Sequence, residues 1–216
     1  EPVIELADRL GLQVACHAIG DQAVRNSIDA IVRAQEINGT GDRRHRIEHL
    51  EYADPEDIPR LGANGITASM QPVHCDPAIA GNWAEMIGPE RADLGFAWPE
   101  YVRTGATLAF GTDTPTAPHM PLPNMYIGAT RRSPDQPDLE PLRPDFALPI
   151  DETIVHGTRD AAWASFEEGR LGVIRVGACA DLVVIDDDPF ANGPEALLRA
   201  RVRRTVSAGR TVHLPD

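Results

Sequence analysis

The chain has 216 residues, 42% hydrophobic and 25% charged, with a formal net charge of −13 at pH 7. This length suits one large domain or one domain with a smaller appendage, and the acidic balance argues against nucleic acid and anionic membranes as partners. No apolar run approaches the roughly 18 residues of a membrane span. Three widely spaced cysteines without a CxxC pair exclude a disulfide framework and a zinc finger. We therefore expect a globular protein of the reducing cytoplasm.

The first two-thirds of the chain alternate between helical and strand patterns. Strands that alternate with helices pair in parallel through right-handed crossovers, so we expect an α/β fold with a parallel sheet or barrel. In chain order, the patterns predict a helix over 1–10, a strand over 12–17, a helix over 21–37 capped by Asp21, a strand over 45–50, a helix from Asp54 to about 61, a strand over 65–70, a helix over 98–105 and a strand over 107–113.

The last third of the chain changes character. Residues 114–150 contain nine prolines and one plausible helical piece, which is typical of a lid or binding loop. A helix capped by Asp151 is predicted over 151–168. From Gly169 onward, apolar runs between glycine and proline turns predict strands, the first of them over 171–177. We therefore expect a barrel-type domain over 1–168 and a small antiparallel β unit over 169–216.

Three of the predicted strands end close to a possible metal ligand. These residues are His17, His49 and Asp113. The carboxyl ends of parallel strands lie on one face, where binding sites gather. Imidazole is the commonest metal ligand, and a carboxylate can complete such a site or act as its general base. The alternative, three polar groups that bond to neighbouring loops, stays open at this point.

Five motifs occur in an order that resembles the amidohydrolase superfamily. The nearest resemblance is to the YtcJ-like, amidohydrolase-3 branch, which includes N-substituted formamide deformylases. The motifs are HAIGDQA (17–23), RHRIEHLEYAD (44–54), ITASMQPVH (66–74), LAFGTDTP (108–115) and GVIRVGACADLVVIDDDPF (172–190).

This resemblance implies strands five to eight of a (β/α)8 barrel, followed by part of a composite β domain. It also implies hydrolysis of amide or formamide C–N bonds with one or two zinc ions, or another divalent metal. His17 and His49 would then be the metal ligands of strands five and six. Asp113 would contact the metal and act as the general base and acid, with activated water attacking the carbonyl carbon.

The matched motifs also place further residues on the site face. Asp21, Gln71 and His74 are expected to contact a small amide-type substrate, although Asp21 could equally be only a helix cap. Gln71 and His74 could likewise be only hydrogen-bond partners of the loops. His45, between two arginines, is expected to have a supporting or structural role.

The sequence also departs from the family pattern. It contains no His-x-His, and it lacks the bridging residue expected on strand four. We therefore expect a truncated half of an enzyme, whose edge strands at 12–17 and 107–113 are covered by the other half-barrel or by a second copy. One alternative is a degenerate or split half-barrel that serves as a non-catalytic binding or assembly module. Another is an unrelated α/β domain, in which the rings of His17 and His49 would lie more than about 6 Å apart.

Overall fold

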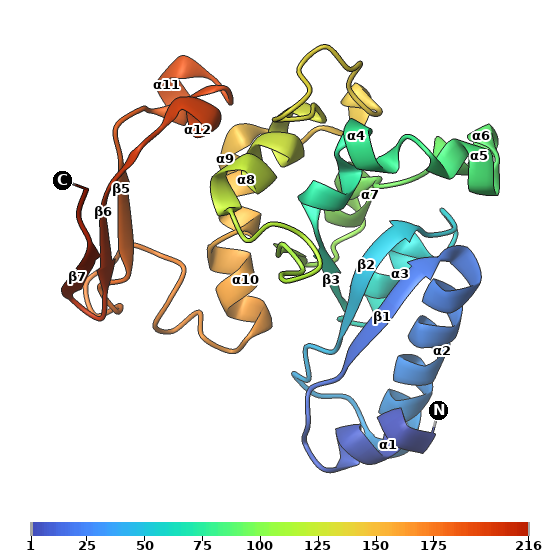
Figure 1. Ribbon diagram of the computed structural model, residues 1–216. Helices are drawn as coiled ribbons and strands as arrows, with labels where there is room; N and C mark the ends of the chain where they lie inside the picture. The colour runs from blue at the N-terminus through green and yellow to red at the C-terminus, as the bar shows by residue number, and fades with distance from the viewer. Residues whose placement is uncertain (1, 216) are drawn as a thin grey trace. The chain divides into compact units, whose positions relative to one another are not determined.

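The protein is described by a computed structural model that covers residues 2–215 (Figure 1). Internal contacts divide the chain into two compact units. The first unit comprises Glu1–Gln71 and Ile79–Ala109, and the second comprises Pro72–Ala78 and Phe110–Asp216. The expected domains, 1–168 and 169–216, stay a prediction.

The first unit is built on a sheet with the strand order β1-β2-β3-β4. β1 pairs with β2 in parallel, and β2 pairs with β3 in parallel, which confirms the expected α/β fold with a parallel sheet. Ile47 on β2 and Ala68 on β3 are fully buried, as expected for strands covered on both faces. The strands are β1 (Ala15–Gly20), β2 (Arg46–Tyr52), β3 (Thr67–Met70) and β4 (Leu108–Phe110).

Helices connect these strands, and the longest of them supplies much of the core. α2 buries Val24, Ile28 and Ile31, which recur at helical spacing and form its apolar stripe. The helices of this part of the chain are α1 (Pro2–Arg9), α2 (Asp21–Asn38), α3 (Ile58–Ala63), α4 (Pro77–Ala80), α5 (Trp83–Ile87), α6 (Pro89–Ala92) and α7 (Trp98–Arg103).

Several predicted boundaries in the first unit were wrong. β1 begins at Ala15 and continues to Gly20, so His17 is the third residue of the strand rather than its last. α2 starts directly after this strand with Gly20 in the cap position, and Asp21 is therefore its first helical residue rather than its cap. The helix expected from Asp54 begins only at Ile58, because the Asp54 carboxylate accepts the amide of Glu56 and stabilises a turn instead.

A buried carboxylate ties α1 to the start of β2. Asp8 is 1% exposed and accepts hydrogen bonds from Asn38 Nδ2 (2.8 Å), Arg43 Nε (2.7 Å) and His45 Nε2 (3.0 Å). His45 Nδ1 accepts the amide of Val14 at 3.1 Å, so the ring proton lies on Nε2 and the imidazole is neutral. Burial raises the pKa of Asp8, but these hydrogen bonds outweigh it and leave the pKa below its usual value. His45 therefore has a structural role.

The second unit carries the predicted antiparallel sheet. β6 pairs with both β5 and β7 in antiparallel register, which confirms the strand type expected after Gly169. Its elements are η1 (Pro72–Cys75), α8 (Pro121–Thr130), η2 (Pro144–Phe146), α9 (Ile150–His156), α10 (Arg159–Ala164), β5 (Leu182–Ile185), α11 (Pro189–Asn192), α12 (Ala196–Arg199), β6 (Val202–Ser207) and β7 (Arg210–His213).

Two predictions for the second unit were wrong, and one helix was not predicted. The helix expected over 151–168 is two helices, α9 and α10, because Thr158 has a non-helical backbone with φ −128° and ψ −81°. The strand expected over 171–177 is a series of turns, in which Gly172 has φ +79°. α11 was not predicted, although Asp188 before Pro189 is a recognisable start signal: its carboxylate accepts two amides of the helix.

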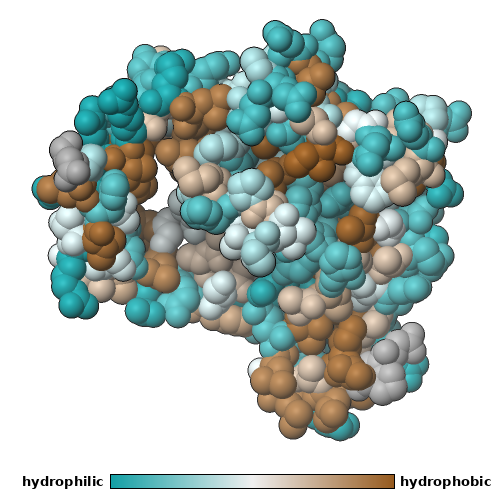
Figure 2. Space-filling model, in the orientation of Figure 1, coloured by the Kyte–Doolittle hydropathy of each residue, from teal (hydrophilic) through white to brown (hydrophobic). Residues whose placement is uncertain are grey.

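An apolar surface lies around α1 and the end of α2 in the first unit, where Figure 2 shows a brown patch. β1 is the outer strand of the sheet on this side, and no strand within residues 2–215 pairs with its free edge. Within the same residues, no helix is both long and apolar enough to cross a membrane. The exposed apolar side chains are Val3, Leu6, Leu10, Leu12 and Ile37.

Candidate functional site

Two histidines from neighbouring strands meet in the first unit. His17 on β1 and His49 on β2 have ring centroids 4.4 Å apart, with the ring planes at 70°. His17 pairs with Glu48 and Ala18 with His49 in the parallel register, so the two histidines are offset by one residue on adjacent strands. His17 is exposed and His49 is 6% exposed. This proximity contradicts the alternative of an unrelated domain, which requires widely separated rings.

Gln71 determines which nitrogen of His49 carries the proton. Its amide oxygen lies 2.9 Å from His49 Nδ1, and its amide nitrogen lies 3.4 Å from a carboxylate oxygen of Glu48. Because the amide nitrogen faces a carboxylate, the oxygen faces the imidazole and accepts a proton from Nδ1. Nε2 of His49 therefore carries the lone pair that a metal ion needs. This is the arrangement in which a second group orients a metal-binding histidine.

A third candidate ligand in the first unit, Glu51, was not predicted from the sequence. Glu51 is 4% exposed and follows His49 by two residues on β2. Ligand atoms of His49 and Glu51 lie within 4.8 Å of each other. The signal was present in the sequence as the segment His-Leu-Glu, in which a carboxylate stands at strand spacing from the histidine.

Two of the expected ligands have unusual backbones. His49 has φ 79° and Asp113 has φ 61°, in the left-handed region that favours glycine. A non-glycine residue held there costs on the order of 1–3 kcal/mol, and such residues cluster at active sites and ligand-binding segments. The strained positions therefore mark His49 and Asp113 as candidates for function.

The second unit holds a separate pair, His74 and Asp113. His74 lies in η1, Asp113 follows β4, and His74 Nε2 is 3.7 Å from Asp113 Oδ2. Asn124, on α8 and 5% exposed, connects the two segments. Its side chain accepts the amide of Val73 at 2.8 Å and donates to the carbonyl of Gly111 at 3.0 Å. Asn124 thus holds the backbone just before His74, at Val73, and just before Asp113, at Gly111.

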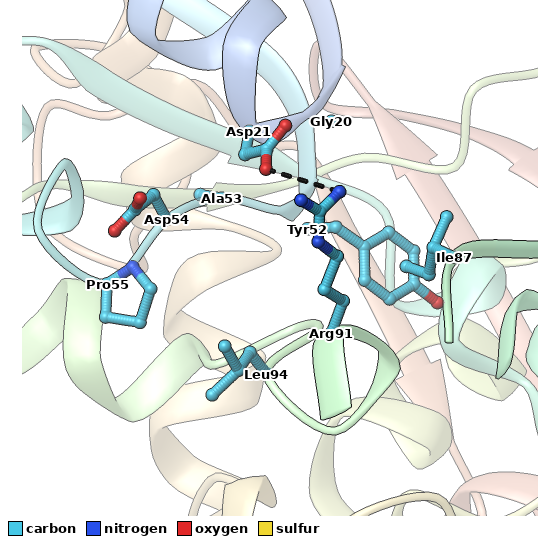
Figure 3. A pocket seen from close by; sticks show the side chains of 9 residues that line it. All are labelled: Gly20, Asp21, Tyr52, Ala53, Asp54, Pro55, Ile87, Arg91 and Leu94. Atoms are coloured by element: carbon cyan, nitrogen blue, oxygen red, sulfur yellow. Dashed lines mark ion pairs between the residues drawn. The ribbon is translucent and has the colours of Figure 1, made fainter. Parts of the chain in front are cut away.

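A pocket of about 360 Å³ lies in the first unit beyond the carboxyl ends of β1 and β2 (Figure 3). Asp21, an expected substrate-binding residue, lines it together with Arg91, and Oδ2 of Asp21 is 3.8 Å from Nη1 of Arg91. The structure thus places Asp21 in a pocket, Gln71 against His49, and His74 beside Asp113. The complete lining is Gly20, Asp21, Tyr52, Ala53, Asp54, Pro55, Ile87, Arg91 and Leu94.

Comparison with known families identifies the chain. Residues 1–213 match the family described as Amidohydrolase family (Amidohydro_3). The chain belongs to this family. It is 31% identical over 212 residues to the amidohydrolase-family protein YtcJ of Bacillus subtilis (strain 168), an alignment that covers 98% of this chain. It is 26% identical over 208 residues to the N-substituted formamide deformylase of Arthrobacter pascens, which covers 94% of this chain.

Solved structures share the fold of this amidohydrolase chain. A metal-dependent hydrolase from Pyrococcus horikoshii OT3, whose function is uncharacterised, superposes with a TM-score of 0.72 at 26% identity, over 89% of this chain and 38% of that one. The chain spans 39% of the length of the Bacillus relative and 37% of the Arthrobacter relative. The activity of the whole protein is therefore a matter for proposal.

Proposed function

We propose that the protein containing this chain is a metal-dependent amidohydrolase that cleaves C–N bonds of amides or formamides. The observation that carries the proposal is the pairing of His17 with His49, in which Gln71 keeps the proton of His49 on Nδ1. Membership of the amidohydrolase family supports it. We include formamides among the proposed substrates because the Arthrobacter relative is named as an N-substituted formamide deformylase.

His17 and His49 are the proposed metal ligands, and Asp113 is the proposed third ligand. Two imidazoles with a carboxylate suit zinc, as one ion or two, and also suit other divalent metals. The exposed ring of His17 and the orientation of His49 fit such a role. When bound, the metal lowers the pKa of water and polarises a carbonyl group.

Asp113 is the proposed general base and acid. Its carboxylate takes a proton from the attacking water and later delivers it to the departing nitrogen, so the base is regenerated in each turnover. His74 Nε2 lies 3.7 Å from this carboxylate and can orient it. Asp21, Gln71 and His74 are the proposed substrate-side residues, with Gln71 acting through its hydrogen bond to His49.

The exposed apolar side chains around α1 and the free edge of β1 need a covering partner. We propose that a further half-barrel covers them, as the family resemblance implies, with a second copy of the chain as the alternative. Within residues 2–215 none of the three cysteines forms a disulfide, and we propose the expected cytoplasmic location.

Elemental mass spectrometry on protein purified without chelator, combined with an N-benzylformamide hydrolysis assay, tests this function. We expect about one or more divalent ions per chain in the wild type. We expect His17→Ala and His49→Ala to weaken zinc binding at least about 100-fold and to abolish turnover, because each removes a ligand. His213→Ala, which changes an exposed histidine of β7, is the matched control and should retain both properties.

Two outcomes would contradict the proposal. The first is a wild type that stays free of metal after incubation with zinc. The second is a His17→Ala variant that keeps full metal content and activity. Metal retention without hydrolysis of any amide or formamide would instead support a degenerate half-barrel that serves as a binding module.

A further inference from the structure

The pocket at Arg91 combines an apolar wall with a cation that has no close partner. Tyr52, which is 8% exposed, forms part of the wall and is backed by the rings of Trp83 and Phe96, with centroids 5.0 and 5.5 Å away. Ile87 lines the same wall. A volume of about 360 Å³ suits a small organic group, and lining of this kind is typical of small-molecule sites.

Within residues 2–215, the Arg91 guanidinium has only the ion pair with Asp21. At 3.8 Å this pair is longer than a hydrogen bond, and the side chain of Arg91 is 69% exposed. Figure 3 shows Arg91 extending from α6 toward Asp21, beside the ring of Tyr52. Arg25, on the neighbouring hollow, differs: its Nε lies 2.8 Å from Asp57 and its Nη2 lies 3.1 Å from Asp54. Arg91 therefore keeps its donors for a ligand, whereas Arg25 does not.

We propose that this pocket binds the carboxylate of an amphipathic amide substrate, and that Arg91 is the residue that selects it. A guanidinium can bind a carboxylate with two parallel hydrogen bonds, which are stronger and shorter than the 3.8 Å pair with Asp21. The apolar part of the ligand would lie against Tyr52 and Ile87. The identification of this ligand as a substrate rests on the proposed hydrolase function, but the preference for an anion does not.

The charges around the pocket allow an anion to enter. The charged side chains that line the pocket are Asp21, Asp54 and Arg91, and Arg25 of the neighbouring hollow is ion-paired with Asp54 and with Asp57. The Asp54 carboxylate accepts a hydrogen bond from the amide of Glu56 at Oδ1 and another from Nη2 of Arg25 at Oδ2, so each of its oxygens already has a donor. Oδ1 of Asp21 accepts the amide of Gln22. An entering carboxylate therefore competes with only one weakly engaged group, Oδ2 of Asp21.

The position of the pocket relates it to the histidine pair in the same unit. Gly20 lines the pocket and follows His17 by three residues on β1, and Tyr52 follows His49 by three residues on β2. Three strand residues span about 10 Å. A ligand with its carboxylate at the pocket and its amide at the histidines needs a spacer of roughly this order, which an aryl or long alkyl group provides.

Binding of three phenyl compounds, one anionic, one neutral and one cationic, tests the inference directly. Hydrocinnamate, hydrocinnamamide and phenethylamine share one apolar group, and their affinities can be measured by calorimetry on the full polypeptide that contains this chain. Hydrocinnamate should bind at least about ten-fold more tightly than the amide, and Arg91→Gln should abolish this preference. Arg103→Gln removes the same charge from an equally exposed arginine on α7 and should leave the preference intact.

The measurement is repeated on metal-depleted protein, because a carboxylate can also bind a metal ion. The preference for hydrocinnamate should survive metal removal and fall at high salt. Equal affinity for acid and amide would overturn the inference. So would a preference that survives Arg91→Gln, or tighter binding of phenethylamine, which would mean that Asp21 and Asp54 select a cation.

Kinetics separate this inference from the proposed function. In an active preparation, 3-(4-(formamidomethyl)phenyl)propanoate, whose aryl spacer separates the carboxylate from the formamide by roughly the distance from the pocket to the histidines, should have at least about ten-fold higher kcat/KM than N-benzylformamide, which lacks the carboxylate. Arg91→Gln should remove the difference. A protein that hydrolyses neither compound but prefers hydrocinnamate would refute the proposed function and retain the anion site. A protein that hydrolyses both equally would refute the anion site and retain the function.

Discussion

Replacement of Asn124 by alanine should loosen the segments that carry His74 and Asp113. The Asn124 side chain is 5% exposed and makes two hydrogen bonds, one from the amide of Val73 and one to the carbonyl of Gly111. These bonds join positions 51 and 13 residues away in the sequence. Alanine removes both and leaves the main chain of α8 unchanged, so the variant probes the side chain alone.

The expected cost follows from the burial of the two partners. Val73 is 8% exposed, so its amide loses its only identified acceptor in a region that water reaches poorly, which costs about 1–3 kcal/mol. Gly111 is exposed, so water can replace the lost bond to its carbonyl, and the net cost there is about 1 kcal/mol. We expect Asn124→Ala to lower the free energy of unfolding by about 2–4 kcal/mol.

Urea denaturation followed by circular dichroism measures this loss, and amide hydrogen exchange at Val73 locates it. The Val73 amide should exchange at least about ten-fold faster in the variant. Asn192→Ala is the matched control in the same unit, because Asn192 is exposed and its side chain donates a hydrogen bond to Asp187 at the surface; it should cost less than about 0.5 kcal/mol. A change below about 0.5 kcal/mol for Asn124→Ala, with unaltered exchange at Val73, would refute the reasoning.

Three further substitutions test the packing of the first unit. Asp8→Asn should cost about 2 kcal/mol at pH 7. Because hydrogen bonds hold the pKa of Asp8 below its usual value, this stabilisation is present above about pH 4 and is lost as the pH falls through the folded pKa. The gap between the urea midpoints of the wild type and the variant should therefore narrow as the pH falls below about 4, and a constant gap would contradict this account. Gly62→Ala should cost about 1–3 kcal/mol, because a Cβ would overlap the carbonyl of Thr104; a melting temperature equal to that of the wild type would refute it. Tyr101→Phe should cost about 1 kcal/mol through the lost bond to the carbonyl of Leu50, and burial, which raises the pKa of Tyr101, should keep this phenol from ionising at pH 11 in an ultraviolet titration.

The candidate site could be predicted in part because its residues follow repeating local patterns. His17 and His49 each occur on an apolar strand that precedes or follows an amphipathic helix, and parallel pairing brings such strands side by side. Glu51 stands at strand spacing from His49, but the left-handed backbones of His49 and Leu50 interrupt the regular alternation of side chains, so the structure was needed to show that the ligand atoms of His49 and Glu51 lie close together. Their roles in metal binding stay predictions.

Element boundaries were less predictable because they depend on single turns and caps. Gly20, in the cap position, lets β1 run directly into α2, so the strand extends three residues beyond His17. The break between α9 and α10 falls at Gly157, the C-cap of α9, and at Thr158, which has a non-helical backbone; the glycine was a stop signal that the apolar pattern over 151–168 obscured. Such choices change the local free energy by about 1 kcal/mol, which packing against the rest of the unit easily overrides.

The sequence by itself determined the alternation of helices and strands, the parallel sheet, the antiparallel C-terminal strands and the family resemblance. All of these follow from the period of apolar residues and from short ordered motifs, which are local properties of the chain. Only the tertiary structure decided the partners of the polar side chains. The bond from His45 to Asp8 spans 37 residues, and that from His49 to Gln71 spans 22. A buried polar group takes whichever partner the packed fold brings within about 3 Å, and no local pattern encodes that choice.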